Sequence, residues 1–181
     1  MSAANALAAA RAVAVLPIAW AIASDQRAVA LAVFVVAAVS DAIDGWLARR
    51  RLASLAAQGH APAGRLASLG ALVDPLADKV LVVGTLAALA AVGAGWPVTI
   101  LAVLVGAREV LVATLRVRAF ARGAALPAPR SAKAKTALEM GGVALVVLDG
   151  RPWSVVGAGL VGLALVLSIV TLPRYLAARF P

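Results

Sequence analysis

The chain has no cysteine and only one histidine, His60, among its 181 residues. Without cysteine there can be no disulfide bond, no thiol catalysis and no cysteine-based zinc site. A single histidine leaves little scope for imidazole chemistry. Charged residues make up only 14% of the chain. What remains for chemistry is a small set of carboxylates and basic side chains.

Apolar residues are abundant instead, at 64% of the chain with a mean hydropathy of +0.99, whereas a soluble domain is about half apolar. Six apolar segments follow one another, and most are long enough to cross a hydrocarbon layer about 30 Å thick. The fifth has a short apolar core and must begin among Lys133 and Lys135. We therefore expect an all-α, polytopic membrane protein with six transmembrane helices, at residues 12–23, 28–47, 66–92, 97–119, 136–148 and 154–172.

Basic residues gather in alternate connections between these segments and in the C-terminal tail, while the other connections carry only Arg27 and Arg151. The positive-inside rule then places both termini and the basic connections in the cytoplasm, in a multi-pass protein of the plasma membrane. Arg11 lies too far inside the first segment for a cleaved signal peptide. The net charge of +9 favours lipid head groups and phosphate substrates as partners and not nucleic acid, because no soluble basic domain is present.

Four carboxylates lie in two otherwise apolar pieces, D-A-I-D-G-W-L-A-R at 41–49 and G-A-L-V-D-P-L-A-D at 70–78. In helices, Asp41 and Asp44 share one face, and Asp74 and Asp78 share another. An uncompensated carboxylate in an apolar interior costs several kcal/mol, so such groups protonate, pair with cations or bind metal. Oxygen-only ligands favour Mg²⁺ or Mn²⁺. Structural ion pairs and a carboxylate-based cation carrier are the alternative interpretations.

Together the two pieces resemble the signature of the CDP-alcohol phosphatidyltransferases, D-x-x-D-G-x-x-A-R followed by G-x-x-x-D-x-x-x-D. Eight positions match: Asp41, Asp44, Gly45, Ala48, Arg49, Gly70, Asp74 and Asp78. The 20 residues between Arg49 and Gly70 exceed the spacing usual in the family. We expect residues 50–64 to form a cytoplasmic insert, with a short interfacial helix at 52–57, inside a single domain that spans residues 1–181.

The resemblance implies a membrane enzyme, expected to be a homodimer, that moves a phosphatidyl group from CDP-diacylglycerol to an alcohol and releases CMP. It implies two Mg²⁺ or Mn²⁺ ions held by the four aspartates, with Asp78 also acting as the catalytic base. It also implies a binding site for the CDP donor formed by Asn5, Gly45, Ala48, Arg49 and Gly70.

Three further elements resemble one branch of this family, the phosphatidylglycerophosphate synthases, whose acceptor is sn-glycerol 3-phosphate. They are Asn5, Arg11 and Pro17 in the first segment, R-E-x-x-x-x-x-L-R at 108–116, and S-A-K-A-K-T-A-L-E-M at 131–140. The chain departs from the usual residues at three positions: Ala8 replaces Thr or Ser, Ala132 replaces Gly, and Glu139 replaces Gln. The resemblance implies an acceptor site formed by Arg108, Arg116, Lys133 and Lys135.

Several alternatives stay open for these residues. Phosphatidylglycerol, as in cardiolipin synthesis, and inositol phosphate are the other possible acceptors. Arg108 and Glu109 can form a buried ion pair without a catalytic role, and the lysines can serve only to fix topology. Lys79 follows Asp78 directly, and we expect it to balance the acidic cluster instead of extending to the membrane surface.

Overall fold

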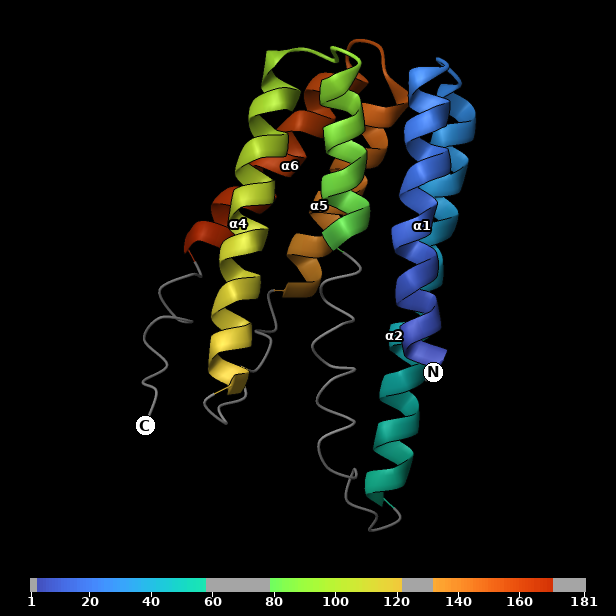
Figure 1. The fold of residues 1–181 in the computed structure, drawn as a ribbon, viewed down its shortest axis with the longest axis vertical. Helices are drawn as coiled ribbons and strands as arrows, with labels where there is room; N and C mark the ends of the chain where they lie inside the picture. Colours follow the sequence, from blue (N-terminus) through green and yellow to red (C-terminus); the bar gives the residue numbers. More distant parts are fainter. Residues whose placement is uncertain (1–2, 58–78, 122–131, 171–181) are drawn as a thin grey trace.

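The computed structural model describes residues 3–57, 79–121 and 132–170, apart from the side chains of several residues near the helix ends. All secondary structure in these ranges is α-helical, which confirms the all-α prediction. The helices run alternately up and down the long axis of the molecule (Figure 1). Their bounds are Ala3–Ala23 for α1, Arg27–Ala57 for α2, Lys79–Ala91 for an unlabelled helix, Trp96–Ala121 for α4, Ala132–Leu148 for α5 and Trp153–Val170 for α6.

Three short connections, at residues 24–26, 92–95 and 149–152, lie together at the top of the molecule in Figure 1. Trp20, Trp96 and Trp153 lie within about one helical turn of these connections, and their exposed fractions are 61%, 76% and 49%. We call this the tryptophan end. The polypeptide reverses direction sharply there, with Gly93 in the left-handed region at φ 78°, where a residue with a Cβ would be strained.

The opposite end of the bundle carries most of the basic positions, and we call it the basic end. It comprises the last turns of α2 and α4, the first turns of α5 and the start of the Lys79–Ala91 helix. Basic residues in these turns are Arg49, Arg50, Arg51, Lys79, Arg116, Arg118, Lys133 and Lys135. At the tryptophan end, the basic residues of the described connections are only Arg27 and Arg151. The uneven charge of the connections in the sequence therefore places most basic residues at one end of the bundle.

The helix α2 is longer than the sequence predicts. It continues without interruption for 31 residues to Ala57, and its last turns extend beyond the start of α1 in Figure 1. Residues 52–57 are helical, as predicted, but they continue α2 and do not form a helix of their own. No proline or glycine lies between Gly45 and Gln58, and the intervening Ala, Leu and Arg residues are strong helix formers, so nothing ends the helix earlier.

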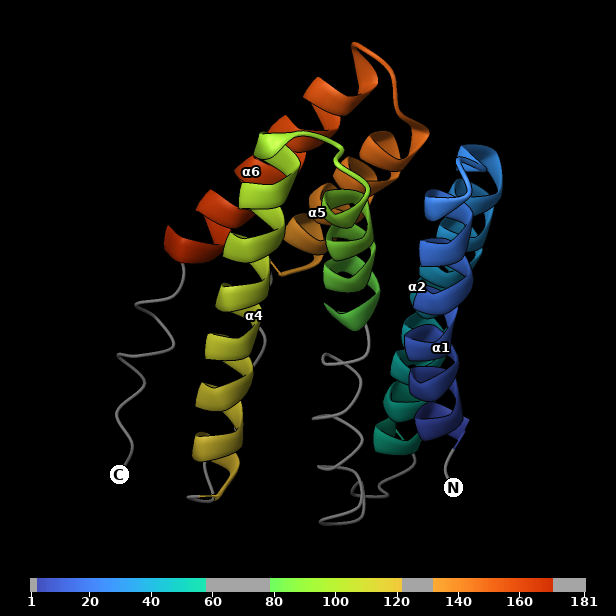
Figure 2. The same ribbon diagram turned by 45° about the horizontal axis from the view of Figure 1, so that its top comes forward.

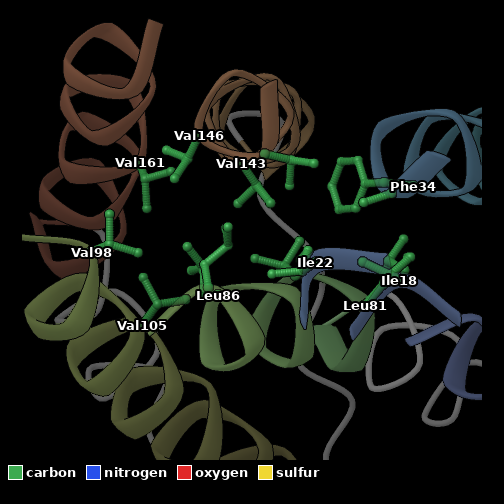
Figure 3. Packing of buried hydrophobic residues seen from close by; sticks show 14 of the residues in the cluster. Ile18, Ile22, Phe34, Leu81, Leu86, Val98, Val105, Val143, Val146 and Val161 are labelled. Carbon is green, nitrogen blue, oxygen red and sulfur yellow. The ribbon is translucent and has the colours of Figure 1, made fainter. Parts of the chain in front are cut away.

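The Lys79–Ala91 helix lies at the centre of the hydrophobic core. Leu81, Val82, Leu86 and Leu89 are each at most 1% exposed. Figure 3 shows Leu86 facing side chains from α1, α4, α5 and α6. This helix directly follows residues 70–78, the second carboxylate-bearing piece of the sequence. The core therefore anchors the helix that begins where this piece ends. The other core residues are Ile18, Ala21, Ile22, Ala30, Phe34, Val98, Val105, Val143, Val146, Val147, Val161 and Leu165.

Helices α5 and α6 approach each other through a pair of glycines. A Cβ added at Gly142 would lie 2.7 Å from the Gly157 carbonyl oxygen, and one added at Gly157 would lie 2.5 Å from the Gly142 carbonyl oxygen. Both distances are shorter than any normal contact. Small residues at such crossings let two helix backbones pack closely. In lipid this close packing favours helix association, because lipid tails are as apolar as the side chains and no hydrophobic effect brings the helices together. Elsewhere α1 packs against α2, as both views show (Figures 1 and 2).

Two of the described helices are long and apolar enough to cross a membrane, Trp96–Leu115 in α4 and Trp153–Val170 in α6. Only 22% of each stretch is buried, whereas the core helix of a soluble protein would be mostly buried. Three further apolar helices are shorter: Ala10–Ala23, Arg27–Ser40 and Lys79–Ala91. Large exposed apolar side chains also lie on the outer faces of the bundle, among them Leu16, Val36, Val103, Val110, Val155 and Val170.

Candidate functional site

The first pair of predicted metal ligands lies on one helix. Asp41 and Asp44 both fall inside α2, where the backbone is continuous helix. Positions three residues apart in a helix lie on the same side, one turn from each other. The side chains of both aspartates lie outside what the structure describes, as do Asp74 and Asp78 altogether. The predicted four-carboxylate cluster therefore remains a prediction.

The donor site predicted by the resemblance falls on α1 and α2, which pack against each other. Asn5 lies in the first turns of α1, and Gly45, Ala48 and Arg49 lie in α2. Their side chains are not described, and Gly70 lies outside the described ranges. Beside them on α2, the Arg50 guanidinium lies over the Trp46 ring, 4.3 Å from its centroid. That separation is typical of a cation–π contact, which keeps the Arg50 side chain close to the helix.

Lys79 is the centre of an ion network between three helices. Its ammonium nitrogen Nζ lies 2.7 Å from Glu139 Oε2 on α5 and 3.8 Å from Glu109 Oε1 on α4. On α4, Arg108 Nη1 donates to the same Glu109 Oε1. Arg108 and Glu109 thus form the ion pair that the sequence left open as an alternative to acceptor binding. Lys79 points into the bundle toward these glutamates, so it does not extend to the membrane surface.

The network lies in the partly buried interior of the bundle. The side chains of Lys79, Arg108, Glu109 and Glu139 are only 10% to 19% exposed. Each described contact joins a positive group to a negative one, which offsets the cost of holding charge in an apolar interior. Such groups within an apolar bundle are by default associated with function.

The residues predicted to bind the acceptor have mixed outcomes. Lys135 lies on α5 one helical turn before Glu139 and is 7% exposed. Arg108 lies on α4 inside the ion network. Arg116 and Lys133 fall in the helices α4 and α5, but their side chains are not described. The structure therefore places Arg108 in the ion network and Lys135 one helical turn from Glu139, a member of that network.

Sequence reasoning did not predict the two glutamate partners of Lys79, which are Glu139 and Glu109. It expected Lys79 to balance the four aspartates, and that expectation stays a prediction because their side chains lie outside the described part of the chain. Glu139 was treated only as a replacement for a glutamine. That replacement was itself the available signal, because an extra carboxylate in an apolar helix needs a cation.

The chemistry of the available ligand atoms decides whether a divalent ion fits this chain. Among the side chains that the structure describes, no three acidic, histidine or cysteine residues lie close enough together to hold a metal. The aspartates of the signature fall outside that set. Their chemistry nevertheless fits, since carboxylate oxygens are the preferred ligands of Mg²⁺ and Mn²⁺. The helical backbone of α2 also places positions 41 and 44 one turn apart on the same side.

Two of the described helices are apolar, mostly exposed and long enough to span a bilayer, which indicates a helical membrane protein. The chain belongs to the CDP-alcohol phosphatidyltransferase family, whose profile matches residues 1–171. It is accordingly an enzyme of this class, a transferase of phospholipid biosynthesis.

Curated relatives support the same family. A Mycobacterium tuberculosis protein named "Probable phosphatidylglycerophosphate synthase" is 34% identical over 156 residues, which cover 85% of this chain and 67% of the relative. A Shigella flexneri protein named "CDP-diacylglycerol--glycerol-3-phosphate 3-phosphatidyltransferase" is 34% identical over 168 residues, 90% of this chain and 82% of the relative. A Salmonella choleraesuis protein with the same name is 33% identical over 168 residues.

Proposed function

We propose that this enzyme transfers a phosphatidyl group from CDP-diacylglycerol to sn-glycerol 3-phosphate and releases CMP. The names of its relatives support both substrates. The structural observation that carries the proposal is the burial of Lys135, 7% exposed, one turn from an ion network that also contains Arg108. Buried basic groups of this kind suit a small phosphate dianion better than an uncharged alcohol.

In the proposed reaction, the hydroxyl oxygen of the acceptor attacks the phosphorus that carries the diacylglycerol. The bond from this phosphorus to the CMP oxygen breaks, and CMP leaves with the electron pair of that bond. Asp78 accepts the proton of the attacking hydroxyl. Arg49 holds the donor diphosphate, and the lack of a side chain at Gly45 lets the phosphate approach the backbone of α2. Most of the catalysis is then positioning and charge neutralisation, as is general for phosphoryl transfer.

Asp41, Asp44, Asp74 and Asp78 are proposed to hold two divalent ions, Mg²⁺ or Mn²⁺. When bound, these ions would neutralise the charge of the donor diphosphate. The chain contributes the ligand carboxylates. On α2, the rigid helix fixes the spacing between Asp41 and Asp44.

The proposed placement in the membrane has six spans, with the basic end in the cytoplasm. Exposed tryptophans mark the opposite interface, as expected for rings that prefer the head-group level of a bilayer. Arginines and lysines gather at the basic end, as the positive-inside rule requires of a cytoplasmic face. The diacyl tails of the donor would stay in lipid while its cytidine and the acceptor enter from the cytoplasm. We further propose a single domain over residues 1–181, an insert at 50–64 and a homodimer in the plasma membrane.

The acceptor assignment is tested by measuring CMP release from CDP-diacylglycerol by purified protein, with glycerol 3-phosphate, phosphatidylglycerol, inositol phosphate and glycerol offered separately. We expect CMP release with glycerol 3-phosphate and a lipid product that carries a terminal phosphate. Efficient use of phosphatidylglycerol or inositol phosphate instead would overturn the acceptor. No CMP release with any acceptor, together with transport of a divalent cation into vesicles, would favour the cation carrier.

A further inference from the structure

Glu139 carries a charge that the proposed reaction does not use. No substrate atom is assigned to it, yet its carboxylate is buried and makes the shortest contact that Lys79 has with a described residue, 2.7 Å. At the corresponding place the resemblance leads one to expect a neutral glutamine. A buried charge with such close geometry calls for a physical role.

The Lys79–Glu139 contact joins the two parts of the proposed site. Lys79 is the residue that follows Asp78, the proposed base, and it begins the helix at the centre of the core. Glu139 lies on α5 one turn after Lys135, which is proposed to bind the acceptor. One charge-assisted hydrogen bond therefore ties the helix that follows the base to the helix that carries the acceptor ligands.

The contact is sensitive to small changes because it is short and lies between two helices. A neutral amide at position 139 would replace a charge-assisted hydrogen bond with a weaker one, about half as strong. Lys79 Nζ also lies 3.8 Å from Glu109 Oε1 on α4, so the same cation is attracted toward a second helix. We expect the start of the Lys79–Ala91 helix to move away from α5 when the bond to Glu139 is weakened.

We propose that Glu139 is a positioning residue for phosphatidyl transfer: by holding Lys79 it fixes the segment that follows Asp78 against α5, and so sets the separation between the base and the acceptor ligands. This inference rests on the proposed function for the roles of Asp78 and Lys135. Misplacement of reacting groups by about 1 Å can cost a hundredfold in rate. We therefore expect loss of this contact to lower kcat more than it changes the KM of either substrate.

The kinetic test compares Glu139→Gln, Lys79→Gln and the double variant that carries both changes. Each single change leaves one charged group facing an amide, while the double variant allows a hydrogen bond between two amides across the same gap. We expect each single variant to lose about tenfold or more in kcat, with both KM values within about twofold of the wild type. The double variant should recover most of the lost kcat.

Three kinetic results would overturn the proposal. One is a kcat of Glu139→Gln within about twofold of the wild type. Another is a double variant no faster than the slower single variant. The third is a raised KM for glycerol 3-phosphate that persists in the double variant, since that result would make Glu139 a direct ligand of the acceptor.

A second readout does not depend on activity. Because the chain has no cysteine, spin labels can be attached at Ala87→Cys and Gly141→Cys, two exposed positions on the Lys79–Ala91 helix and α5. A Cβ at Gly141 meets nothing within 4 Å. Pulsed electron paramagnetic resonance should give a shifted or broadened distance distribution in Glu139→Gln and a wild-type distribution in the double variant. An unchanged distribution in Glu139→Gln would contradict a positioning role.

Controls separate the possible failures. The ion pair Arg27–Asp149 at the tryptophan end offers a matched variant, Arg27→Gln with Asp149→Asn, which should leave both the label distance and kcat unchanged. If Glu139→Gln does not fold, Glu139→Asp keeps the charge but withdraws it by one methylene, and the same loss of kcat and shift in distance are expected. If the wild type releases no CMP with any acceptor, the proposed function fails, while the spin-label result still decides whether Glu139 holds the helices.

Discussion

The two ends of the bundle each contain an ion pair between distant segments, and the pairs differ in a way that explains their roles. At the tryptophan end, Arg27 Nη2 lies 3.7 Å from Asp149 Oδ2, and the Asp149 side chain is 57% exposed. In the interior toward the basic end, Lys79 Nζ lies 2.7 Å from Glu139 Oε2, and the exposed fractions are 19% and 10%. An exposed pair contributes about 0–1 kcal/mol, whereas breaking a buried one costs about 3–5 kcal/mol.

This difference separates one half of the bundle, which is held by packing, from the other half, which contains the buried charges. The half near the tryptophan end is held by close backbone contact between α5 and α6 at Gly142 and Gly157 and by apolar side chains. The half near the basic end contains the buried charges, which a fold without a use for them would replace with apolar residues. We propose on this basis that the chemistry lies at the basic end and that the tryptophan end anchors the bundle.

The largest expected effect comes from the proposed base. Asp78→Asn keeps the size of the side chain but cannot accept a proton, so kcat should fall by about 10² to 10⁴, the usual range for a general base. Binding of CDP-diacylglycerol should change little. Steady-state kinetics and a donor-binding titration measure the two effects. Asp149→Asn at the tryptophan end is the control and should keep wild-type kcat. Wild-type turnover in Asp78→Asn would refute the base assignment.

The acceptor ligands should come next in size. Lys135→Ala removes one charge-assisted bond to the acceptor phosphate, worth about 1.5–3 kcal/mol, and so should raise the KM for glycerol 3-phosphate by roughly ten- to a hundredfold. The KM for CDP-diacylglycerol should rise much less. Arg118→Ala, an exposed basic residue on α4 near the same end, is the control for a topology role and should change neither KM. Equal weakening toward both substrates would contradict the assignment.

Much of the fold follows from the sequence because its apolar segments and their breakers are unambiguous. The ends of the helices at 24–26, 92–95 and 149–152 agree with the predicted segments to within a few residues. The length of α2 was not predictable from hydropathy, because residues 48–57 are polar enough to leave the membrane yet remain strong helix formers. A hydropathy pattern predicts which residues lie in the membrane, but it does not predict where a helix ends.

The candidate site was less accessible to sequence reasoning. Motif spacing identified Asp41 and Asp44, and the backbone places them on one side of α2. The ion pair of Arg108 with Glu109 was considered only as an alternative to a role in acceptor binding. The pairing of Lys79 with Glu139 spans 60 positions and depends on how three helices are arranged in space. Sequence patterns along one helix contain no such information.

A third prediction tests the close packing of α5 and α6 in the half near the tryptophan end. Gly142→Ala should destabilise the protein although Ala is the better helix former, because its Cβ would lie 2.7 Å from the Gly157 carbonyl oxygen. Overpacking costs about 1–3 kcal/mol, which should lower the Tm by roughly 2–12 °C in a detergent-solubilised sample. At the neighbouring Gly141, where a Cβ meets nothing within 4 Å, the same substitution should leave the Tm unchanged or raise it slightly. Equal Tm values for the two variants would disprove the close α5–α6 crossing.

The smallest expected effect concerns the insert. Shortening residues 52–62 to a spacing usual in the family should leave activity within about tenfold of the wild type, equivalent to about 1.4 kcal/mol. Part of this stretch extends α2 beyond the predicted span, so the deletion removes helix that lies past the proposed membrane surface. Specific activity of the folded variant is the measurement. Complete loss in a protein that keeps its Tm would show that the insert shapes the donor site.

Binding of Mn²⁺ tests the central claim most directly, because it asks which end of the bundle holds the ions without requiring turnover. Electron paramagnetic resonance of free Mn²⁺ in a titration counts the ions bound to the wild type, to Asp44→Asn and to Asp149→Asn. Our account predicts about two ions bound by the wild type and by Asp149→Asn. It predicts strongly weakened binding by Asp44→Asn, since an amide removes the charge that holds the cation. Wild-type binding by Asp44→Asn, or loss of binding in Asp149→Asn, would contradict it.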